Sequence, residues 1–260
     1  MISDDPVWLL ITEEANVSIA EESLLSEFYQ SAILDHSDLA SALSYNLANQ
    51  FSGSAIPSAA IEKLILDVLK VDPSITVSAR LDIMASFKRD PACDKHLIPL
   101  LYFKGFQAIQ LHRVAHWYWC NNRTALALFL QNQVAEVFAV DIHPGARIGS
   151  GIMIDHATGL VVGETAIIGD NVSILHSVTL GGSGSGEGNR HPEVGSGVMI
   201  AAGAKIIGNV KIGDGVKVGA GSLVIESIPP HATVVGVPAR IVGAPLEGSP
   251  SFEMNQHLDV

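Results

Sequence analysis

Residues 203–224 read GAKIIGNVKIGDGVKVGAGSLV, a stretch in which an aliphatic residue recurs every six residues. The same interval can be followed back through most of the second half of the chain. A fixed period of six is typical of a parallel β-helix, in which each hexapeptide supplies one short strand and one corner. We therefore expect a left-handed parallel β-helix of hexapeptide repeats over residues 140–243, with about four coils. The aliphatic positions are Ile142, Ile148, Ile154, Val162, Ile168, Ile174, Leu180, Val194, Ile200, Ile206, Ile212, Val218 and Val224.

The first half of the chain follows a different period. Apolar residues recur three and four residues apart in IEKLILDVLK (residues 61–70) and in LHRVAHWYWCNNRTALALFLQNQVAEVF (residues 111–138). This spacing is typical of amphipathic helices. It predicts an all-helical domain over residues 1–139, and hence an α+β protein in which the β-helix follows the helices. Residues 244–260 are expected to form a C-terminal tail.

Charge and cysteine content narrow the classes of partner. The 260 residues carry a formal net charge of −12, which argues against nucleic acid or an anionic membrane as the main partner. Cys93 and Cys120 have no metal-binding or redox spacing, so we expect reduced thiols and a cytoplasmic protein. The acidic N-terminus lacks a signal peptide's basic region, and no apolar run reaches the roughly 18 residues of a membrane helix.

The six-residue repeat is first broken at IDHATGLV, residues 154–161, where eight residues stand in place of six. The extra residues lie beside Asp155 and His156. Imidazole is the side chain best suited to proton transfer near neutral pH. Insertions in a solenoid form loops on one face, which is often the binding face.

The second break is GGSGSGEGNRHPE, residues 181–193, a loop inserted between two hexapeptides. It contains Arg190 and His191. A single histidine on a loop is usually an ordinary surface residue. A histidine beside a charged residue at both breaks favours a functional site, and the sequence predicts that this site is formed by the two loops.

Other motifs are weaker. His112 and His116 stand four residues apart on a predicted helix, but the glutamate of a zinc-binding HExxH motif is absent, so helix packing is favoured. The glycine-rich loop matches no nucleotide-binding motif, and no GxSxG nucleophile motif occurs. No metal is expected.

These motifs closely resemble the serine O-acetyltransferase family, from about Ile65 to Gly243. The resemblance is densest in RDPAC, VDIHPGARIGSGIMIDHATGLVVGETA, SVTLGG, NRHP and GVPARIVG. Hexapeptide repeats alone would indicate only the broader acyltransferase superfamily, whereas VDIHP, DHATG and RHP after a helical domain are more specific. The resemblance implies transfer of the acetyl group of acetyl-CoA to the hydroxyl of L-serine. The products would be O-acetyl-L-serine and CoA, in the first step of cysteine biosynthesis from serine.

The resemblance also implies residue roles. His156 would be the general base that takes the proton of the serine hydroxyl, which attacks the thioester directly. Asp141 would orient and charge that imidazole, as carboxylates do in other catalytic dyads. His191 would complete the catalytic set.

Four further residues would bind the amino acid. Asp90 and Asp155 would hold its ammonium group, and Arg190 would face its carboxylate. Glu164 matches a family position near the site.

Acetyl-CoA is implied as co-substrate, lying along the coils beyond the loop. The small residues Gly182, Ala202 and Ala220 would leave room for its pantetheine arm. Lys217 and Arg240 are the candidates for contact with its phosphates.

The family forms trimers of β-helices with sites between chains, and the trimers pair into hexamers through the helical domains. Its C-terminal tail often ends in Ile and inserts into O-acetylserine sulfhydrylase. This chain ends at Val260, a smaller anchor. A homo-oligomer is therefore expected, and the sulfhydrylase is a candidate partner.

Three rival functions stay open at this point. One is a hexapeptide-repeat enzyme that acetylates a sugar or an antibiotic. Another is a non-catalytic scaffold for a sulfhydrylase. The third is a metal enzyme like the γ-class carbonic anhydrases, which share the β-helix and use three histidines; His143, His156, His176 and His191 could superficially supply them.

Overall fold

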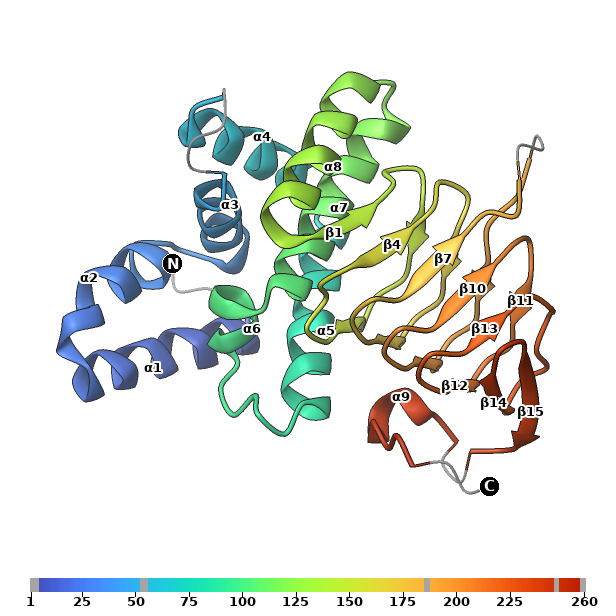
Figure 1. The fold of residues 1–260 in the computed structure, drawn as a ribbon. Helices are drawn as coiled ribbons and strands as arrows, with labels where there is room; N and C mark the ends of the chain where they lie inside the picture. The colour runs from blue at the N-terminus through green and yellow to red at the C-terminus, as the bar shows by residue number, and fades with distance from the viewer. Residues whose placement is uncertain (1–4, 52–55, 185–187, 246–247, 258–260) are drawn as a thin grey trace.

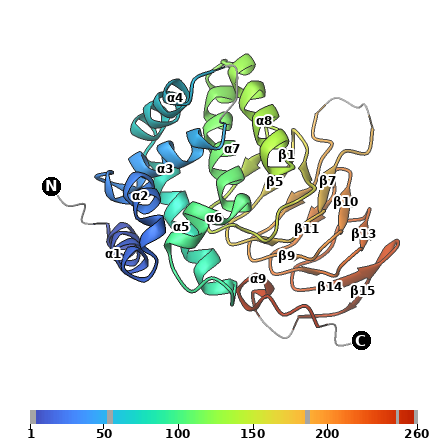
Figure 2. The ribbon, with the colours of Figure 1, turned by 60° about the vertical axis from the view of Figure 1, so that its left-hand side comes forward.

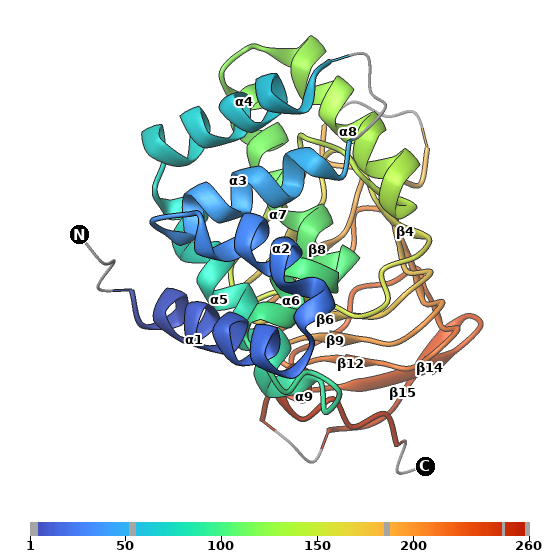
Figure 3. The same ribbon diagram turned by 90° about the vertical axis from the view of Figure 1, so that its left-hand side faces the viewer.

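The computed structural model describes residues 5–51, 56–184, 188–245 and 248–257. A group of helices packs against one end of a three-sided parallel β-helix (Figure 1). Seen from the helical side, the N-terminal helices lie outermost, in front of α5 and α7 (Figure 3). The helices are α1 (Pro6–Glu21), α2 (Ser26–Tyr29), α3 (Leu39–Asn49), α4 (Ser58–Val71), α5 (Ser74–Arg89), α6 (Leu97–Tyr102), α7 (Lys104–Cys120) and α8 (Thr124–Phe138). Within the described residues, no helix combines the length and apolarity needed to span a membrane.

The strands form three sheets, one on each side of the β-helix, with parallel pairing apart from the last two strands of the third sheet. The first sheet has the order β1 (Val140–Ile142), β4 (Leu160–Val162), β7 (Thr179–Gly181), β10 (Lys205–Ile207) and β13 (Leu223–Val224). The second has β2 (Arg147–Ile148), β5 (Ile167–Ile168), β8 (Glu193–Val194) and β11 (Lys211–Ile212). The third has β3 (Met153–Ile154), β6 (Ser173–Ile174), β9 (Met199–Ile200), β12 (Lys217–Val218), β14 (Thr233–Gly236) and β15 (Ala239–Gly243).

Each sheet stacks the aliphatic residues of the hexapeptide repeat. In the first sheet Ile142 pairs with Val162, Val162 with Leu180, and Leu180 with Ile206. All four side chains are buried in the core. The register therefore follows the sequence period, and the expected parallel β-helix after a helical region is confirmed.

The expectation of about four coils is too low, because the first sheet alone has five strands. After Val224 the six-residue spacing is lost. Ile228 nevertheless forms a parallel bridge with Ile212, and Val234 pairs with Val218, so another coil is completed. The antiparallel strand β15 then pairs with β14 and closes the edge of the third sheet.

The corners that follow the second and third sheets need a left-handed backbone. The residue three places after the inward aliphatic has φ between +57° and +71° there, a region that glycine adopts without a Cβ penalty. This explains glycine at most of these positions and asparagine at one. The residues are Gly151, Ala157, Asn171, Ser177, Gly197, Gly203, Gly215 and Gly221.

A buried carboxylate joins the helices to the first coil. Asp82, on α5, is fully buried and accepts three hydrogen bonds, each 2.8 Å long, from Gln110 Nε2, Arg113 Nη2 and the Ile152 amide. Arg113, on α7, also donates to the carbonyls of residues 148–149. Two helices and the start of the β-helix thus share one polar network.

We predict that Asp82→Ala lowers the free energy of unfolding by about 3–5 kcal/mol, because it leaves the buried Arg113 without its counter-ion. The matched control is Asp67→Ala, which removes the exposed partner of Lys63 and should cost no more than about 1 kcal/mol. Chemical denaturation of both variants measures the difference. Equal, small losses would contradict the role of Asp82.

Candidate active site

His156 stands out from the β-helix at the first break of the repeat. The two-residue insertion places both His156 and Ala157 in the left-handed region, with φ of +56° and +58°. Its imidazole is 74% exposed, and Nδ1 lies 3.6 Å from Asp155 Oδ1. The ring of His176, one coil further on, meets it edge to face at 5.8 Å between centroids. The wide corner thus presents an accessible base instead of a packed side chain.

A cavity of about 460 Å³ lies beside His156, between the helices and the first coil. Asp155 lines it from the β-helix, and Asp90 lines it from the C-terminal end of α5. Burial raises the pKa of Asp155, and the Asp90 carboxylate raises it further, whereas His156 lowers it. Two carboxylates facing one cavity favour a bound cation.

Arg190 and His191 gather at a different corner, after β4. Arg190 Nη2 forms an ion pair with Glu164 Oε2 at 2.6 Å. The Thr165 amide donates to His191 Nδ1 at 3.2 Å, so the neutral ring carries its proton on Nε2. Burial lowers the pKa of His191, and the neighbouring Arg190 lowers it further. His191 is therefore held as a neutral imidazole with one N–H free to donate.

Two residues at this corner were not identified from the sequence. A Cβ on Gly163 would lie 2.0 Å from the His191 ring, so only glycine leaves space for that ring. Thr165 also accepts the Arg190 amide on its hydroxyl at 3.1 Å. Gly163 is one of many glycines that follow an inward aliphatic, so its special role carried no separate signal in the sequence.

Asp141 lies on β1, and its Oδ1 accepts a hydrogen bond from Gln131 Nε2 of α8 at 2.7 Å. Among the described residues, no hydrogen bond or ion pair joins Asp141 to His156; the carboxylate within reach of that imidazole is Asp155. The pairing of Asp141 with His156 stays a prediction.

The structure therefore divides the predicted site into two half-sites at opposite ends of β4. The first half-site contains Asp90, Asp155 and His156, before the strand. The second half-site contains Glu164, Arg190 and His191, after it. A three-residue strand alone spans about 10 Å. One chain does not bring the two half-sites together around one small molecule.

The residues predicted to contact acetyl-CoA lie in different places. Ala202 and Ala220 occupy the same corner as His156 on later coils, where the amide of Gly221 donates to the Ala202 carbonyl at 2.8 Å. These two small residues continue, beyond His176, the corner that begins at His156. Gly182 lies instead against His191, at the other corner.

The two predicted phosphate contacts also differ. Lys217 is 4% exposed, and its ammonium donates to the carbonyl of His257 in the C-terminal segment, so it does not face the small-residue corner. Arg240 is exposed on β15.

The four histidines considered for a metal site are divided in the same way. His156 and His176 share one corner, and His143 and His191 lie at the other. Across the described ranges, no three His, Cys, Asp or Glu side chains are close enough together to hold a metal ion.

Comparison with known proteins adds independent findings. The model of the serine acetyltransferase N-terminal domain matches residues 7–111, and the bacterial transferase hexapeptide model, with six repeats, matches residues 191–226. The serine acetyltransferases of Escherichia coli K12 and Salmonella typhimurium are each 54% identical over 253 residues, which cover 97% of this chain and 93% of theirs.

Solved structures agree with this similarity. Serine acetyltransferase from Vibrio cholerae superposes with a TM-score of 0.96 at 50% identity, covering 98% of both chains. The Brucella abortus serine acetyltransferase in complex with coenzyme A gives a TM-score of 0.90 at 44% identity, covering 92% of this chain and 96% of that one.

We predict that Gly163→Ala displaces the His191 ring into solvent. Since burial is the main reason that the His191 pKa is low, the variant should show a higher His191 pKa, closer to that of an ordinary histidine. NMR titration of the imidazole resonances measures it. Gly243→Ala, where a Cβ meets no atom within 4 Å, is the control and should leave the pKa unchanged. An unaltered His191 pKa in Gly163→Ala would contradict the packing described above.

Proposed function

The chain belongs to the serine acetyltransferase family, and we propose that it transfers the acetyl group of acetyl-CoA to the hydroxyl of L-serine with His156 as general base. The products are O-acetyl-L-serine and CoA, in the first step of cysteine biosynthesis from serine. The observation that carries the catalytic assignment is the exposed His156 at the corner with the two-residue insertion, beside a cavity with two carboxylates.

L-Serine is a zwitterion and needs both signs of charge. Asp90 and Asp155 bind its ammonium group: burial, and then the Asp90 carboxylate, raise the pKa of Asp155, and a bound cation would favour its ionised form. Arg190 binds the substrate carboxylate, with Glu164 holding the guanidinium in place. His191 donates its Nε2 hydrogen to the bound substrate.

His156 takes the proton of the serine hydroxyl, and the oxygen attacks the acetyl carbonyl carbon directly. When the tetrahedral intermediate collapses, the C–S bond breaks and the imidazolium returns the proton to the leaving thiolate. A carboxylate beside the ring stabilises the imidazolium. Asp155 stands in this place in the single chain, and the Asp141 carboxylate, whose Oδ1 accepts from Gln131, is the second candidate.

Acetyl-CoA is the co-substrate, in line with the relative solved in complex with coenzyme A. We place its pantetheine arm along the corner of Ala202 and Ala220, because these small side chains continue the corner of His156 and His176 on later coils. Arg240 is retained as a phosphate contact. Lys217 is not, since its ammonium is already bonded to the C-terminal segment.

The divided site supports a homo-oligomer. We propose a trimer in which the first half-site of one chain meets the second half-site of its neighbour. The outer side of β4 between the half-sites carries the exposed Val161, which such an interface would cover. A second set of exposed apolar side chains on the N-terminal helices would pair two trimers. This set comprises Leu9, Leu10, Val17, Leu24, Leu25 and Phe28.

The C-terminal segment has two parts. Helix α9 (Pro250–Glu253) lies beneath the β-helix and contacts α5 (Figure 2). Ser173 Oγ donates to the Ser251 carbonyl, and the Arg89 guanidinium lies 4.5 Å above the Phe252 ring. We propose that the residues after α9 bind O-acetylserine sulfhydrylase; Val260 itself lies outside the described residues.

The two unpaired cysteines support a cytoplasmic location.

We predict that His156→Ala lowers serine-dependent release of CoA by about 10² to 10⁴, because general-base catalysis is lost. A thiol-reactive dye measures the CoA. His36→Ala is the control: His36 is bonded to the Ser31 carbonyl in the helical region, and its loss should leave the rate near that of the wild type. Wild-type activity on sugars but not on L-serine would instead favour the sugar acetyltransferase. Residual activity above a tenth in His156→Ala would overturn its assignment as base.

We predict that deleting residues 254–260 weakens sulfhydrylase binding and leaves kcat and KM for serine unchanged. Both deletions remove the His257 carbonyl that accepts from the buried Lys217. Deleting residues 251–260 also removes Phe252 and Ser251, so it should lower the melting temperature further or raise the KM for serine through Arg89, the neighbour of Asp90. Calorimetric titration with sulfhydrylase and steady-state kinetics separate the effects. Undiminished sulfhydrylase binding by the shorter deletion would refute the tail proposal.

A further inference from the structure

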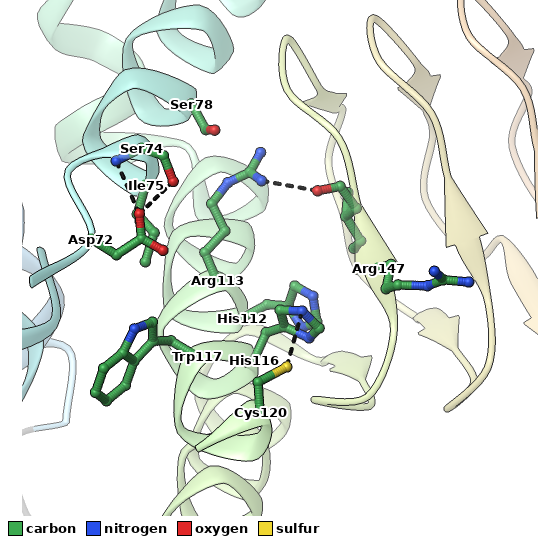
Figure 4. A pocket seen from close by; sticks show the side chains of 11 residues that line it. Asp72, Ser74, Ile75, Ser78, His112, Arg113, His116, Trp117, Cys120 and Arg147 are labelled. Carbon is green, nitrogen blue, oxygen red and sulfur yellow. Dashed lines mark hydrogen bonds between the residues drawn. The ribbon is translucent and has the colours of Figure 1, made fainter.

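The helices cover the first edge of the β-helix, where the opening coil has no preceding strand to pair with. Strands β1, β2 and β3 are the edge strands of the three sheets. At β2, Arg113 of α7 donates to the Ile148 carbonyl oxygen at 3.2 Å (Figure 4). At β3, which leads into the corner of His156, the first turn of α7 lies against the strand itself. The packing of α7 therefore bears directly on the chain that carries His156.

Gly105, the second residue of α7, is the point of closest approach. It is buried, and a Cβ on it would lie 2.1 Å from the Ile154 carbonyl oxygen and 2.9 Å from the Ile154 Cβ. The oxygen belongs to the main chain of β3, and the Ile154 side chain is buried in the core, so neither can move away. Only glycine allows α7 to reach the residue that precedes Asp155 and His156.

Lys104, the first residue of α7, reaches the other side of the same corner. Its ammonium group donates to the Thr158 hydroxyl. The His156 carbonyl oxygen in turn accepts from the Thr158 amide at 2.6 Å and from the Thr158 hydroxyl at 3.3 Å. Within the described part of the chain Lys104 forms no ion pair, although it lines the same cavity as Asp90 and Asp155. The ammonium group thus supports the corner and leaves both carboxylates to the substrate.

The corner needs support because two consecutive residues with a Cβ, His156 and Ala157, adopt the left-handed conformation. Such residues cost free energy and persist where the surrounding structure holds them in place. The His156 imidazole is 74% exposed, so its direction depends on the backbone from which it projects. That backbone is held before and after the histidine by two adjacent residues of one helical turn.

We propose that Lys104 and Gly105 are positioning residues for the base His156, an inference that rests on the proposed function. Gly105 sets how closely α7 approaches β3, and Lys104 holds the chain after His156, so that the imidazole faces the cavity in which L-serine binds. A displacement of about 1 Å at a reacting group can lower a rate by about 10². Loss of the lysine contact therefore lowers kcat. The KM for serine is kept, because the carboxylates that bind its ammonium group are unchanged.

The first test is the steady-state kinetics of Lys104→Met and Thr158→Val, which keep the side-chain shape and remove the hydrogen bond. Each should lower kcat about tenfold and leave the KM for serine within about twofold of the wild type. The double variant should be no slower than either single variant, since both remove the same interaction. Lys104→Arg and Thr158→Ser keep the donor and the acceptor and should recover most of the rate. Lys63→Met removes an exposed lysine of α4 and should equal the wild type.

A second test does not depend on activity. The His156 and His176 rings meet edge to face, so the NMR chemical shift of the His156 Cε1–H group reports how the two rings are oriented. This resonance is identified by its absence from His156→Ala. In Lys104→Met and Thr158→Val it should move towards its position in protein unfolded in urea. If the wild type shows no serine-dependent release of CoA, the proposed function fails and the resonance alone decides the positioning role.

Four results would each overturn the proposal. They are an unchanged kcat in Lys104→Met and Thr158→Val, a KM for serine that rises while kcat is kept, effects that multiply in the double variant, and a His156 resonance that does not move. Gly105→Ala should lower kcat at least as far, and a wild-type kcat would overturn the role of Gly105. If Gly105→Ala does not fold, as far-UV circular dichroism would show, the other two variants decide the proposal.

Discussion

The Asp82 carboxylate is the interaction on which the placement of the other elements depends. It has no solvent contact, so each hydrogen bond from Gln110, Arg113 and the Ile152 amide is needed to offset the cost of burying its charge. That requirement fixes α5 and α7 against the first coil in one orientation. Because α5 is rigid, the same contact sets the position of Asp90 at its far end, opposite Asp155. A structural network thus determines the geometry of the first half-site.

The β-helix contributes a fixed register, and the candidate residues Asp155, His156, Arg190 and His191 lie where that register is interrupted. Successive strands must stack their inward aliphatic residues, so the corner positions of neighbouring coils align along the molecule. At one corner the two extra residues push His156 out of the stack. At another, the absence of a side chain on Gly163 allows the His191 ring to fold in. An insertion and a glycine therefore produce two opposite environments, one imidazole in solvent and one buried and neutral.

The sequence predicted the β-helix because the six-residue spacing of the aliphatic residues is what stacks each of them on its counterpart in the next coil. The last coil escaped prediction because Ile228 and Val234 keep the inward contacts without the six-residue interval. The site residues were identified by type and by resemblance, but their grouping depends on which corner each occupies. Pairings such as Arg190 with Glu164, or Lys217 with the His257 carbonyl, arise from contacts across coils and from the returning C-terminal segment, which no local pattern encodes.

In the proposed trimer, each chain carries two half-sites that become one site only between neighbouring chains. The most direct measurement is the serine-dependent activity of hetero-oligomers made by co-expressing His156→Ala and His191→Ala chains with different affinity tags and purifying on both. Each variant alone should be nearly inactive. If a site takes one half from each of two chains, every mixed trimer that is purified on both tags has one intact interface out of three, so about a third of the wild-type activity should return, or about a quarter if two randomly assembled trimers pair. Hetero-oligomers as inactive as either parent would contradict the claim and place the complete site within a single chain.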